Sequence, residues 1–360
     1  MTRQVLLNPG PVTLSEKVRA ALTRGDWCHR EPEFAELMQS INARLVKVYD
    51  EAADSYEAAT LTGSGTSAVE GMVQSFAPKD SKTLVVANGV YGERIASMLK
   101  AQSKPYLCTE GEWLDAIDVA QVAALLDANP DITTVATVHH ETTTGRLNDL
   151  QPLGGLCKSR GLDMLLDAVS SFGAETIEFD AWNIAAVAAT ANKCLHSVPA
   201  LSFVLAKKEC WQRASQASSV YLDLHSYHKA QYESGFSPFT QSVQPAFALD
   251  AALDELAEQG GWEQRGATYR ARAAKIAETL HGLGVKTLLP PEEYSSVLWT
   301  WLLPEGWNYE RLHDVLKQQG FVIYAGQGNL AATVFRIAHM GDIDGDIDRL
   351  CELFTECFQS

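Results

Sequence analysis

Four polar segments carry side chains that could support chemistry. Lys193 lies in ATANKCLHSVPALSFV (189–204), among small and polar residues and directly before an apolar run. A buried lysine tends to be neutral and nucleophilic, which is what Schiff-base formation with a carbonyl compound requires. The alternative interpretation is a surface lysine on a loop.

A carboxylate precedes this lysine by 26 residues. Asp167 follows the apolar start of MLLDAVSSFGAE (164–175), at the C-terminal end of a predicted buried strand. Ligands of open α/β sheets bind at that edge, and a buried carboxylate needs a partner. In the alternative interpretation, Asp167 caps a helix together with Ser170 and Ser171.

A glycine-rich turn opens the segment LTGSGTSAVEGMVQSF (61–76), and we predict a helix from near Ala68 onwards. Free N–H groups at a helix start, beside small residues, form an anion site. The spacing matches neither the dinucleotide-binding Gly-x-Gly-x-x-Gly pattern nor a P-loop. An ordinary N-cap by Ser64 or Thr66 is the alternative.

The fourth segment, TVHHETTTGRLNDL (137–150), follows another apolar strand and supplies several hydroxyl groups. It can either hydrogen-bond a ligand or satisfy its own backbone as a polar turn. The order of the segments is more restrictive than any one of them. Pyridoxal phosphate (PLP) needs this set, because a carboxylate keeps its ring nitrogen protonated, a helix N-terminus binds its phosphate and a lysine binds its aldehyde.

The elements that must position these residues follow from alternating apolar runs and helical patterns. Strands are expected at 83–89, 133–140, 162–171 and 200–206, and a helix is expected at 119–128. This alternation predicts an α/β fold with a mainly parallel sheet between helices. A helix pair interrupted at Gly260-Gly261 is expected from about 250 to 283, and a smaller α+β unit follows it. We predict a large domain over residues 1–250 and a small C-terminal domain over 251–360.

The composition limits the possible partners. The 360 residues are 46% hydrophobic, and 45 acidic against 29 basic side chains give a surface that repels nucleic acid and anionic lipid. The seven cysteines include no Cys-x-x-Cys pair, which argues against a disulfide framework and a zinc site. No apolar stretch reaches the roughly 20 residues needed to span a bilayer, and the N-terminal apolar run is too short for a signal peptide. We therefore expect a cytoplasmic protein with small-molecule partners and no metal.

Over essentially its whole length, the chain resembles the class V aminotransferases of PLP fold type I. The matching segments are LLNPGPV (6–12), HREPEF (29–34), LTGSGTSAVEG (61–71), ANGVYGER (87–94), HHETTTGRLN (139–148), DAVSSFGAE (167–175), ANKCLHSVPALSFV (191–204), GFVIYAG (320–326) and FRIAHMG (335–341). The resemblance implies a sheet of the seven-stranded type in the large domain. Three motifs are most similar to members that move an amino group from 2-aminoethylphosphonate to pyruvate: Glu-Thr-Thr-Thr-Gly, Asn-Gly-x-Tyr-Gly and Ala-Asn-Lys-Cys-x-x-x-Val-Pro.

The resemblance also implies a role for each site residue. Ser64, Gly65 and Thr66 cradle the cofactor phosphate, Tyr91 stacks on the pyridine ring, Thr142 hydrogen-bonds near the ring oxygen, Asp167 pairs with the ring nitrogen, Asn192 lines the site, and Lys193 is the anchor and proton shuttle. Thr240 matches a position that reaches the phosphate of a neighbouring subunit, which implies a homodimer with shared active sites. Arg336 holds the acidic group of the substrate, beside Gly10.

Several interpretations remain open in the sequence. Tyr91 also fits a packed turn tyrosine, and Arg336 also fits the exposed face of an alternating strand. A serine or alanine:glyoxylate (or pyruvate) aminotransferase shares almost every motif, and a nonenzymatic ligand-binding protein can have the same fold. Pro199 is followed by Ala200 where many relatives carry glycine, which affects the backbone near the lysine.

Four further residues receive no catalytic role. His29 and Arg30 either face the mouth of the site or belong to a turn that caps a helix starting near Pro32. His139 and His140 are adjacent at a strand end, so their side chains point to opposite faces of the strand. At most one of the two histidines is therefore expected to reach the cofactor.

Overall fold

A central sheet dominates the computed structural model, which describes residues 3–359. In spatial order its seven strands are β2 (Tyr56–Gly63), β10 (Ala200–Lys207), β9 (Ile184–Thr190), β8 (Asp163–Asp167), β5 (Ile132–Val138), β3 (Lys82–Val86) and β4 (Tyr106–Cys108). Only β10 runs against its neighbours β2 and β9, and the other neighbouring pairs are parallel. The predicted α/β fold with a mainly parallel sheet is confirmed.

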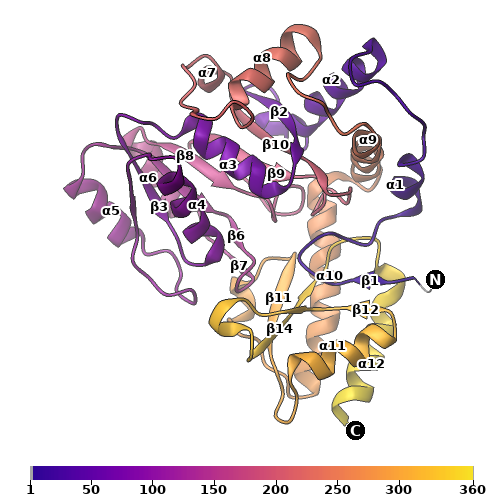
Figure 1. Cartoon of the computed structure of the whole chain (residues 1–360). Coiled ribbons are helices and arrows are strands. Elements are labelled where there is room, and N and C mark those ends of the chain that lie inside the picture. Colours follow the sequence, from indigo (N-terminus) through magenta and orange to yellow (C-terminus); the bar gives the residue numbers. More distant parts are fainter. Residues whose placement is uncertain (1–2, 360) are drawn as a thin grey trace.

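Helices cover both faces of this sheet (Figure 1). One apolar cluster contains α2 (Pro32–Val46), α5 (Val119–Ala128), α6 (Gln151–Arg160) and α9 (Val243–Glu258), and α1 (Glu16–Ala21) packs against α9. The other contains α3 (Gly65–Phe76), α4 (Val90–Ala101), α7 (Lys208–Trp211) and α8 (Leu224–Ser234). Leu84 and Val86 belong to the first cluster and Val85 to the second, because strand side chains alternate between faces.

The C-terminal part is built on two smaller sheets. Its strands and helices are β11 (Leu298–Leu302), β12 (Phe321–Val322), β13 (Tyr324–Ala325), β14 (Val334–Ala338), α10 (Gly261–Gly282), α11 (Tyr309–Gln318) and α12 (Ile347–Gln359). The strand order β11-β14-β13 is antiparallel, while β12 pairs in parallel with the N-terminal strand β1 (Val5–Leu6). The start of the described chain therefore lies beside the C-terminal part (Figure 1).

The predicted domain boundary at residue 250 falls inside α9. Val243, Phe247 and Leu253 of this helix all pack in the core of the large sheet. The chain interrupts its helices at Gly260, between α9 and α10, where the sequence predicted a break. No helix within residues 3–359 combines the length and the apolar character needed to cross a membrane.

The C-terminal end of α3 is held by a buried lysine. Lys104 Nζ donates to the carbonyl oxygens of Val73 at 3.1 Å, Gln74 at 2.6 Å and Ala77. The Gln74 and Ala77 carbonyls lie at the end of α3, where intrahelical donors are missing, whereas the Val73 carbonyl also accepts a hydrogen bond from Ala77 N at 3.0 Å. Burial lowers the pKa of the Lys104 amine to about 7, so the amine holds the helix end mainly as a hydrogen-bond donor.

We expect Lys104→Met to lower the free energy of unfolding by about 2–4 kcal/mol, since buried carbonyl groups lose their donor. Urea denaturation of the holoenzyme measures this change. The control is Lys158→Met, because Lys158 forms an exposed ion pair with Asp180. Exposed ion pairs contribute little, so the control should leave the midpoint nearly unchanged. An equally small effect of Lys104→Met would contradict the prediction.

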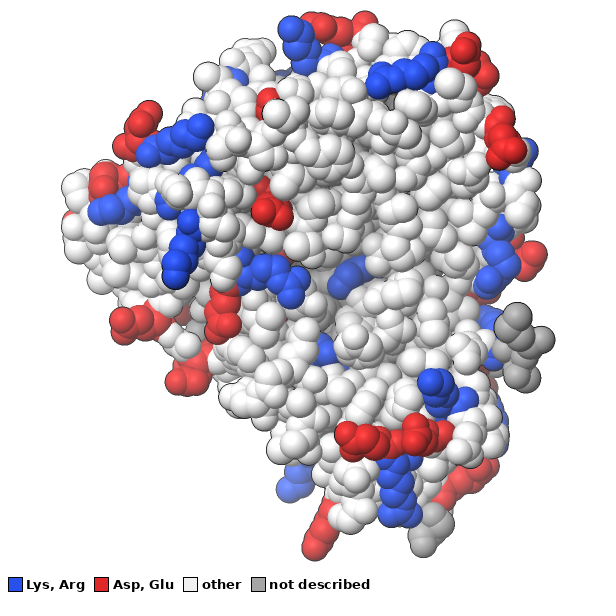
Figure 2. Space-filling view, in the orientation of Figure 1, with Lys and Arg blue, Asp and Glu red and all other residues white. Residues whose placement is uncertain are grey.

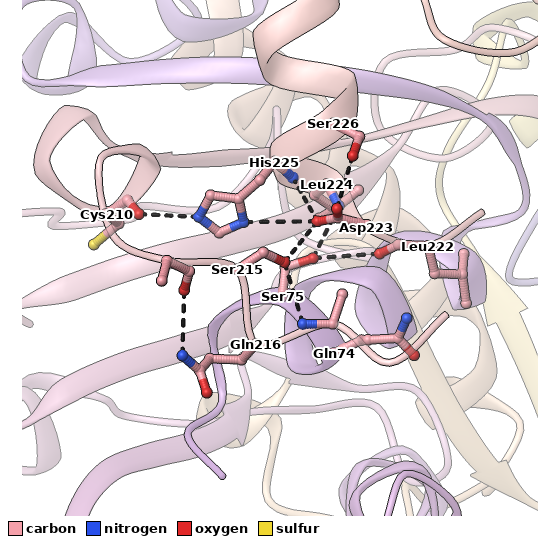
Figure 3. Close-up of polar contacts among 12 residues, drawn as sticks. Gln74, Ser75, Cys210, Ser215, Gln216, Leu222, Asp223, Leu224, His225 and Ser226 are labelled. Atoms are coloured by element: carbon pink, nitrogen blue, oxygen red, sulfur yellow. Dashed lines mark hydrogen bonds and ion pairs between the residues drawn. The ribbon is translucent and has the colours of Figure 1, made fainter. Parts of the chain in front are cut away.

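A second polar cluster joins α3 to the start of α8 (Figure 3). Ser75 Oγ accepts a hydrogen bond from Leu224 N at 2.9 Å, and Asp223 caps α8 through His225 N. The cluster contains serine, histidine and aspartate, but His225 Nε2 lies 3.3 Å from the carbonyl oxygen of Cys210 and its Nδ1 lies 3.9 Å from Asp223. The imidazole is thus directed at a backbone carbonyl, and the cluster fixes α8 instead of activating a serine.

Candidate active site

Five of the predicted site residues follow the C-terminal ends of parallel strands. Ser64 follows β2, Tyr91 follows β3, Asp167 ends β8 and Lys193 follows β9. Thr142 lies in a hairpin after β5, formed by β6 (His140–Glu141) and β7 (Arg146–Leu147). These strands run in one direction, so their carboxyl ends share the edge where α/β sheets bind ligands. Figure 2 shows basic side chains near the middle of this view, where the sheet-bearing and C-terminal parts meet.

The N-terminus of α3 presents free backbone N–H groups at this edge. The helix begins at Gly65, so the prediction of a start near Ala68 was wrong, and Gly65 and Thr66 lie in its first turn. Ser64 is the N-cap residue, but its side chain makes no capping hydrogen bond. A Cβ atom on Gly65 would lie 2.7 Å from Val169 Cγ1, which shows how closely the helix approaches the Asp167 segment.

Asp167 is buried with one carboxylate oxygen already engaged. Its Oδ1 accepts a hydrogen bond from Val169 N at 2.9 Å, which stabilises a turn and not the helix of the alternative interpretation. Burial raises the pKa of Asp167 to about 6, while the Val169 hydrogen bond and the positive charges of Lys193 and Arg94 oppose the shift. The carboxyl group is therefore mostly ionised at neutral pH and favours a cationic partner.

Lys193 lies in the turn after β9, beside two other predicted site residues. A Cβ atom on Gly10 would lie 3.3 Å from both Lys193 Cγ and Asn192 Nδ2, so these three residues are in close contact. Burial lowers the pKa of the Lys193 amine, and Tyr91 and Asp167 partly oppose that shift. The lowered pKa increases the neutral, nucleophilic share of the amine. Lys193 lies in a turn, as the alternative interpretation expected, but its side chain is half-buried and not fully exposed.

Tyr91 is the second residue of α4, and its ring has a cation over one face. The Arg94 guanidinium carbon lies 4.6 Å from the centre of that ring. The positive charge of Arg94 also lowers the pKa of Asp167. Arg94 was not among the predicted site residues, although its spacing of three helical residues from Tyr91 was a usable signal.

Arg336 on β14 is fully buried, so its interpretation as an exposed strand residue is wrong. Nε donates to the Ala325 carbonyl at 2.7 Å, and Nη1 donates to the Thr142 carbonyl at 2.7 Å and lies 3.3 Å from Gln327 Oε1. Nη2 is buried without a hydrogen-bond partner. Burial lowers the pKa of Arg336. The guanidinium thus keeps one nitrogen for an anion and uses the other two to fix its orientation.

The histidines and cysteine near this edge have structural surroundings. His139 Nδ1 lies 3.0 Å from Ser171 Oγ, and His140 Nδ1 lies 3.1 Å from the Ser170 carbonyl oxygen. Burial lowers the pKa of each imidazole to about 3, so both are neutral. Burial also raises the pKa of the Cys194 thiol to about 12, which makes this cysteine unreactive.

Thr240 and Arg30 lie on a different segment from Lys193. Thr240 is exposed in the connection between α8 and α9. Arg30 donates to the carbonyl oxygens of Ser237 at 2.6 Å and Pro238 at 3.2 Å, so it supports the segment that carries Thr240. Arg30 and His29 precede α2, which begins at Pro32 as predicted.

Ala200, the departure from the family pattern, has a left-handed backbone conformation. Its φ angle is 137°, a region that favours glycine. The residue pairs with Gly63 at the start of β10, close to the turn that carries Lys193. Alanine at this position is therefore strained, because it holds a φ angle typical of glycine.

Glu141 is a buried acid that in the sequence belongs only to a possible polar turn. It is the fully buried last residue of β6, and its carboxylate accepts hydrogen bonds from Tyr91 N and Gly92 N. Burial raises the pKa of Glu141 to about 7. The adjacent Thr142 carbonyl binds Arg336, so this hairpin contacts the elements that carry two other site residues.

The unsatisfied groups at this edge fit the chemical groups of PLP. The uncapped N-terminus of α3 suits its phosphate, and the second carboxylate oxygen of Asp167 suits its ring nitrogen. The Lys193 amine suits its aldehyde, and the free Nη2 of Arg336 suits a substrate anion. The fold and site together define a PLP-dependent transaminase.

Comparisons with known proteins agree with this class. The family model for "Aminotransferase class-V" matches residues 16–340. The 2-aminoethylphosphonate--pyruvate transaminase of Bacillus cereus is 34% identical over 97% of this chain and 96% of its own length. The bifunctional phosphonoacetaldehyde hydrolase/aminoethylphosphonate transaminase of Clostridioides difficile is 35% identical over 98% of this chain, which spans 56% of that relative. The structure of a subgroup IV aspartate aminotransferase from Thermus thermophilus superposes with a TM-score of 0.89 at 28% identity, over 99% of both chains.

The chain belongs to the class-V aminotransferase family, as the match over most of its length shows. Its cofactor is therefore pyridoxal phosphate, and its reaction is the transfer of an amino group from a donor to a keto acid acceptor.

Proposed function

We propose that this enzyme transfers the amino group of 2-aminoethylphosphonate to pyruvate, giving phosphonoacetaldehyde and alanine. The free Nη2 of the buried Arg336 carries the proposal, because it offers one cation to a phosphonate in the first half-reaction and to a carboxylate in the second. The names of the near full-length relatives support the same donor. Alanine or serine with glyoxylate is the rival pair, since it would use the same lysine and aspartate.

Each residue at the sheet edge has a defined task in this reaction. The bound cofactor supplies an electron sink for the carbon that carries the amino group. The Lys193 amine would hold the cofactor through its aldehyde, and the same amine, once released, would carry the proton removed from the carbon that bears the amino group. Asp167 holds the proton on the ring nitrogen, and the N–H groups of α3 hold the phosphate. Tyr91 fixes the tilt of the ring by stacking on it.

We also propose a homodimer in which Thr240 of each subunit contacts the phosphate bound by the other. The exposed position of Thr240 supports this arrangement. Arg30 keeps the segment that carries Thr240 in place by donating hydrogen bonds to two of its carbonyl groups. Sedimentation analysis and the PLP affinity of a Thr240→Val variant test the shared site.

A donor titration of the PLP-loaded enzyme tests the reaction. We expect 2-aminoethylphosphonate to remove the visible absorbance of the bound cofactor, and pyruvate to restore it with the release of alanine. Alanine should act as the reverse donor, whereas serine should not react. A response to serine with no response to 2-aminoethylphosphonate would replace this proposal by its rival.

Arg336→Gln should weaken the apparent affinity for 2-aminoethylphosphonate by about 10- to 100-fold, because a charge-assisted hydrogen bond is lost. Arg349→Gln on the exposed face of α12 is the matched control, and it should titrate like the wild type. Unchanged donor affinity in Arg336→Gln would remove the arginine from the anion site.

A further inference from the structure

The helix that carries Tyr91 has no capping side chain of its own. Its N-cap residue is Gly89, and α4 begins at Val90. The first N–H groups of α4 instead donate to the hairpin after β5: Val90 N to Thr143 Oγ1 at 3.1 Å, Tyr91 N to Glu141 Oε2 at 3.2 Å and Gly92 N to the same oxygen at 3.3 Å. A distant segment therefore supplies the cap, and a carboxylate suits the positive end of the helix.

The Glu141 carboxylate is held on its other side as well. Its Oε1 accepts hydrogen bonds from Thr143 Oγ1 at 2.6 Å and from Thr143 N at 3.2 Å. A Cβ atom on Gly89 would lie 2.3 Å from Glu141 Cδ, so the helix start and the carboxylate are in direct contact. These contacts leave the carboxylate one orientation, with a backbone donor on each oxygen.

The same hairpin reaches the substrate arginine. The carbonyl oxygen of Thr142, the residue between Glu141 and Thr143, accepts the hydrogen bond from Arg336 Nη1. Consecutive residues of one hairpin thus contact the helix of Tyr91 and the side chain of Arg336. Burial raises the pKa of Glu141 to about 7, and its hydrogen bonds with Thr143 and Gly92 oppose that shift. The hydrogen bonds favour the charged form that caps the helix.

We propose that Glu141 is a positioning residue, which fixes the ring of Tyr91 against the cofactor and relative to Arg336 by capping α4 from the hairpin. This inference rests on the proposed role of Tyr91 in the cofactor site. It does not depend on which amino donor the enzyme uses. Glu141 touches neither substrate nor cofactor in this role and acts through the backbone of α4.

The circular dichroism of the bound cofactor in its visible band tests the proposal, because this signal reports the environment and tilt of the ring. In Glu141→Gln only one of the two side-chain oxygens remains as a hydrogen-bond acceptor. The NH₂ group that replaces the other oxygen cannot accept a hydrogen bond from a backbone N–H group. We expect an altered visible signal and a PLP dissociation constant raised about tenfold, as for the loss of one charge-assisted hydrogen bond.

Glu175→Gln is the matched control. Glu175 is another buried carboxylate, which accepts hydrogen bonds from Ser295 Oγ, Ser296 N and Ser296 Oγ and has no contact with α4 among the described hydrogen bonds. Its replacement should lower thermal stability as Glu141→Gln does, but should leave the visible signal of the cofactor unchanged. An altered visible signal in Glu141→Gln alone therefore cannot be explained by a loss of stability.

The pair Thr143→Val and Thr143→Ser provides a second test should Glu141→Gln not fold. Valine removes the hydroxyl group that joins Val90 N to Glu141, whereas serine keeps it. We expect the valine variant to show the altered cofactor signal and the serine variant to restore it. Wild-type signals and PLP affinity in both Glu141→Gln and Thr143→Val would overturn the proposal. These measurements use PLP alone, so an error in the proposed donor leaves them unaffected.

Discussion

Replacing Lys193 by alanine is expected to abolish amino transfer and to leave pyridoxal phosphate bound without a covalent link. The Lys193 side chain lies against Gly10 and feels the charges of Asp167 and Tyr91, and the lowered pKa of its amine suits both bond formation and proton transfer. Losing both tasks should reduce turnover by about 10⁴-fold or more. The phosphate and ring-nitrogen contacts remain, because they come from α3 and Asp167.

Steady-state rates, together with absorbance spectra before and after dialysis, measure this prediction. Lys193→Arg is the informative companion, since it keeps a cation at the position but cannot form the carbon–nitrogen bond or accept a proton at neutral pH. It should be as inactive as the alanine variant. An alanine variant with normal turnover would remove Lys193 from the mechanism.

The positions of Asp167 and Lys193 could be predicted from the sequence, because each follows from its place beside an apolar strand. Asp167 and Lys193 each lie next to an apolar run, and parallel strands bring their carboxyl ends to one edge. The start of α3 was not predictable to the residue. Gly65, Thr66 and Ser67 have low intrinsic helix propensity, and the close approach of Gly65 to Val169 is a tertiary contact that no local pattern reveals.

The functions of Glu141 and Arg336 depend on contacts that no local pattern contains. The carboxylate of Glu141 reaches Tyr91 N across 50 residues of sequence, and Arg336 reaches the Thr142 carbonyl across 194. In the sequence, Glu141 looks like part of a polar turn and Arg336 like one side of an alternating strand. Their burial arises only when the hairpin, α4 and β14 pack together, which sequence patterns do not determine.

Asp167→Asn is expected to reduce kcat/KM by about 10²- to 10³-fold, because it removes one partner of a buried charge pair with the protonated ring nitrogen. The substitution is nearly isosteric, and the amide oxygen can still accept the hydrogen bond from Val169 N. The turn should therefore persist while the charge is lost. Kinetics and PLP titration measure the effect, and Asp163→Asn at the other, solvent-facing end of β8 is the matched control.

The same substitution should stabilise the cofactor-free protein. Burial raises the pKa of Asp167 from 3.8 to about 6, so the folded apoenzyme holds this proton more tightly than the unfolded chain and loses stability as pH rises through that interval. A shift of about 2 pKa units corresponds to about 3 kcal/mol. Asp167→Asn apoenzyme should be more stable than wild type at pH above 6, and the difference should shrink as the pH falls towards 4. An Asp167→Asn apoenzyme that is less stable than the wild type at every pH would show that the carboxylate serves the fold. We expect the opposite: the substitution should raise the stability of the apoenzyme and lower kcat/KM. That combination identifies a charge that is buried to bind the cofactor.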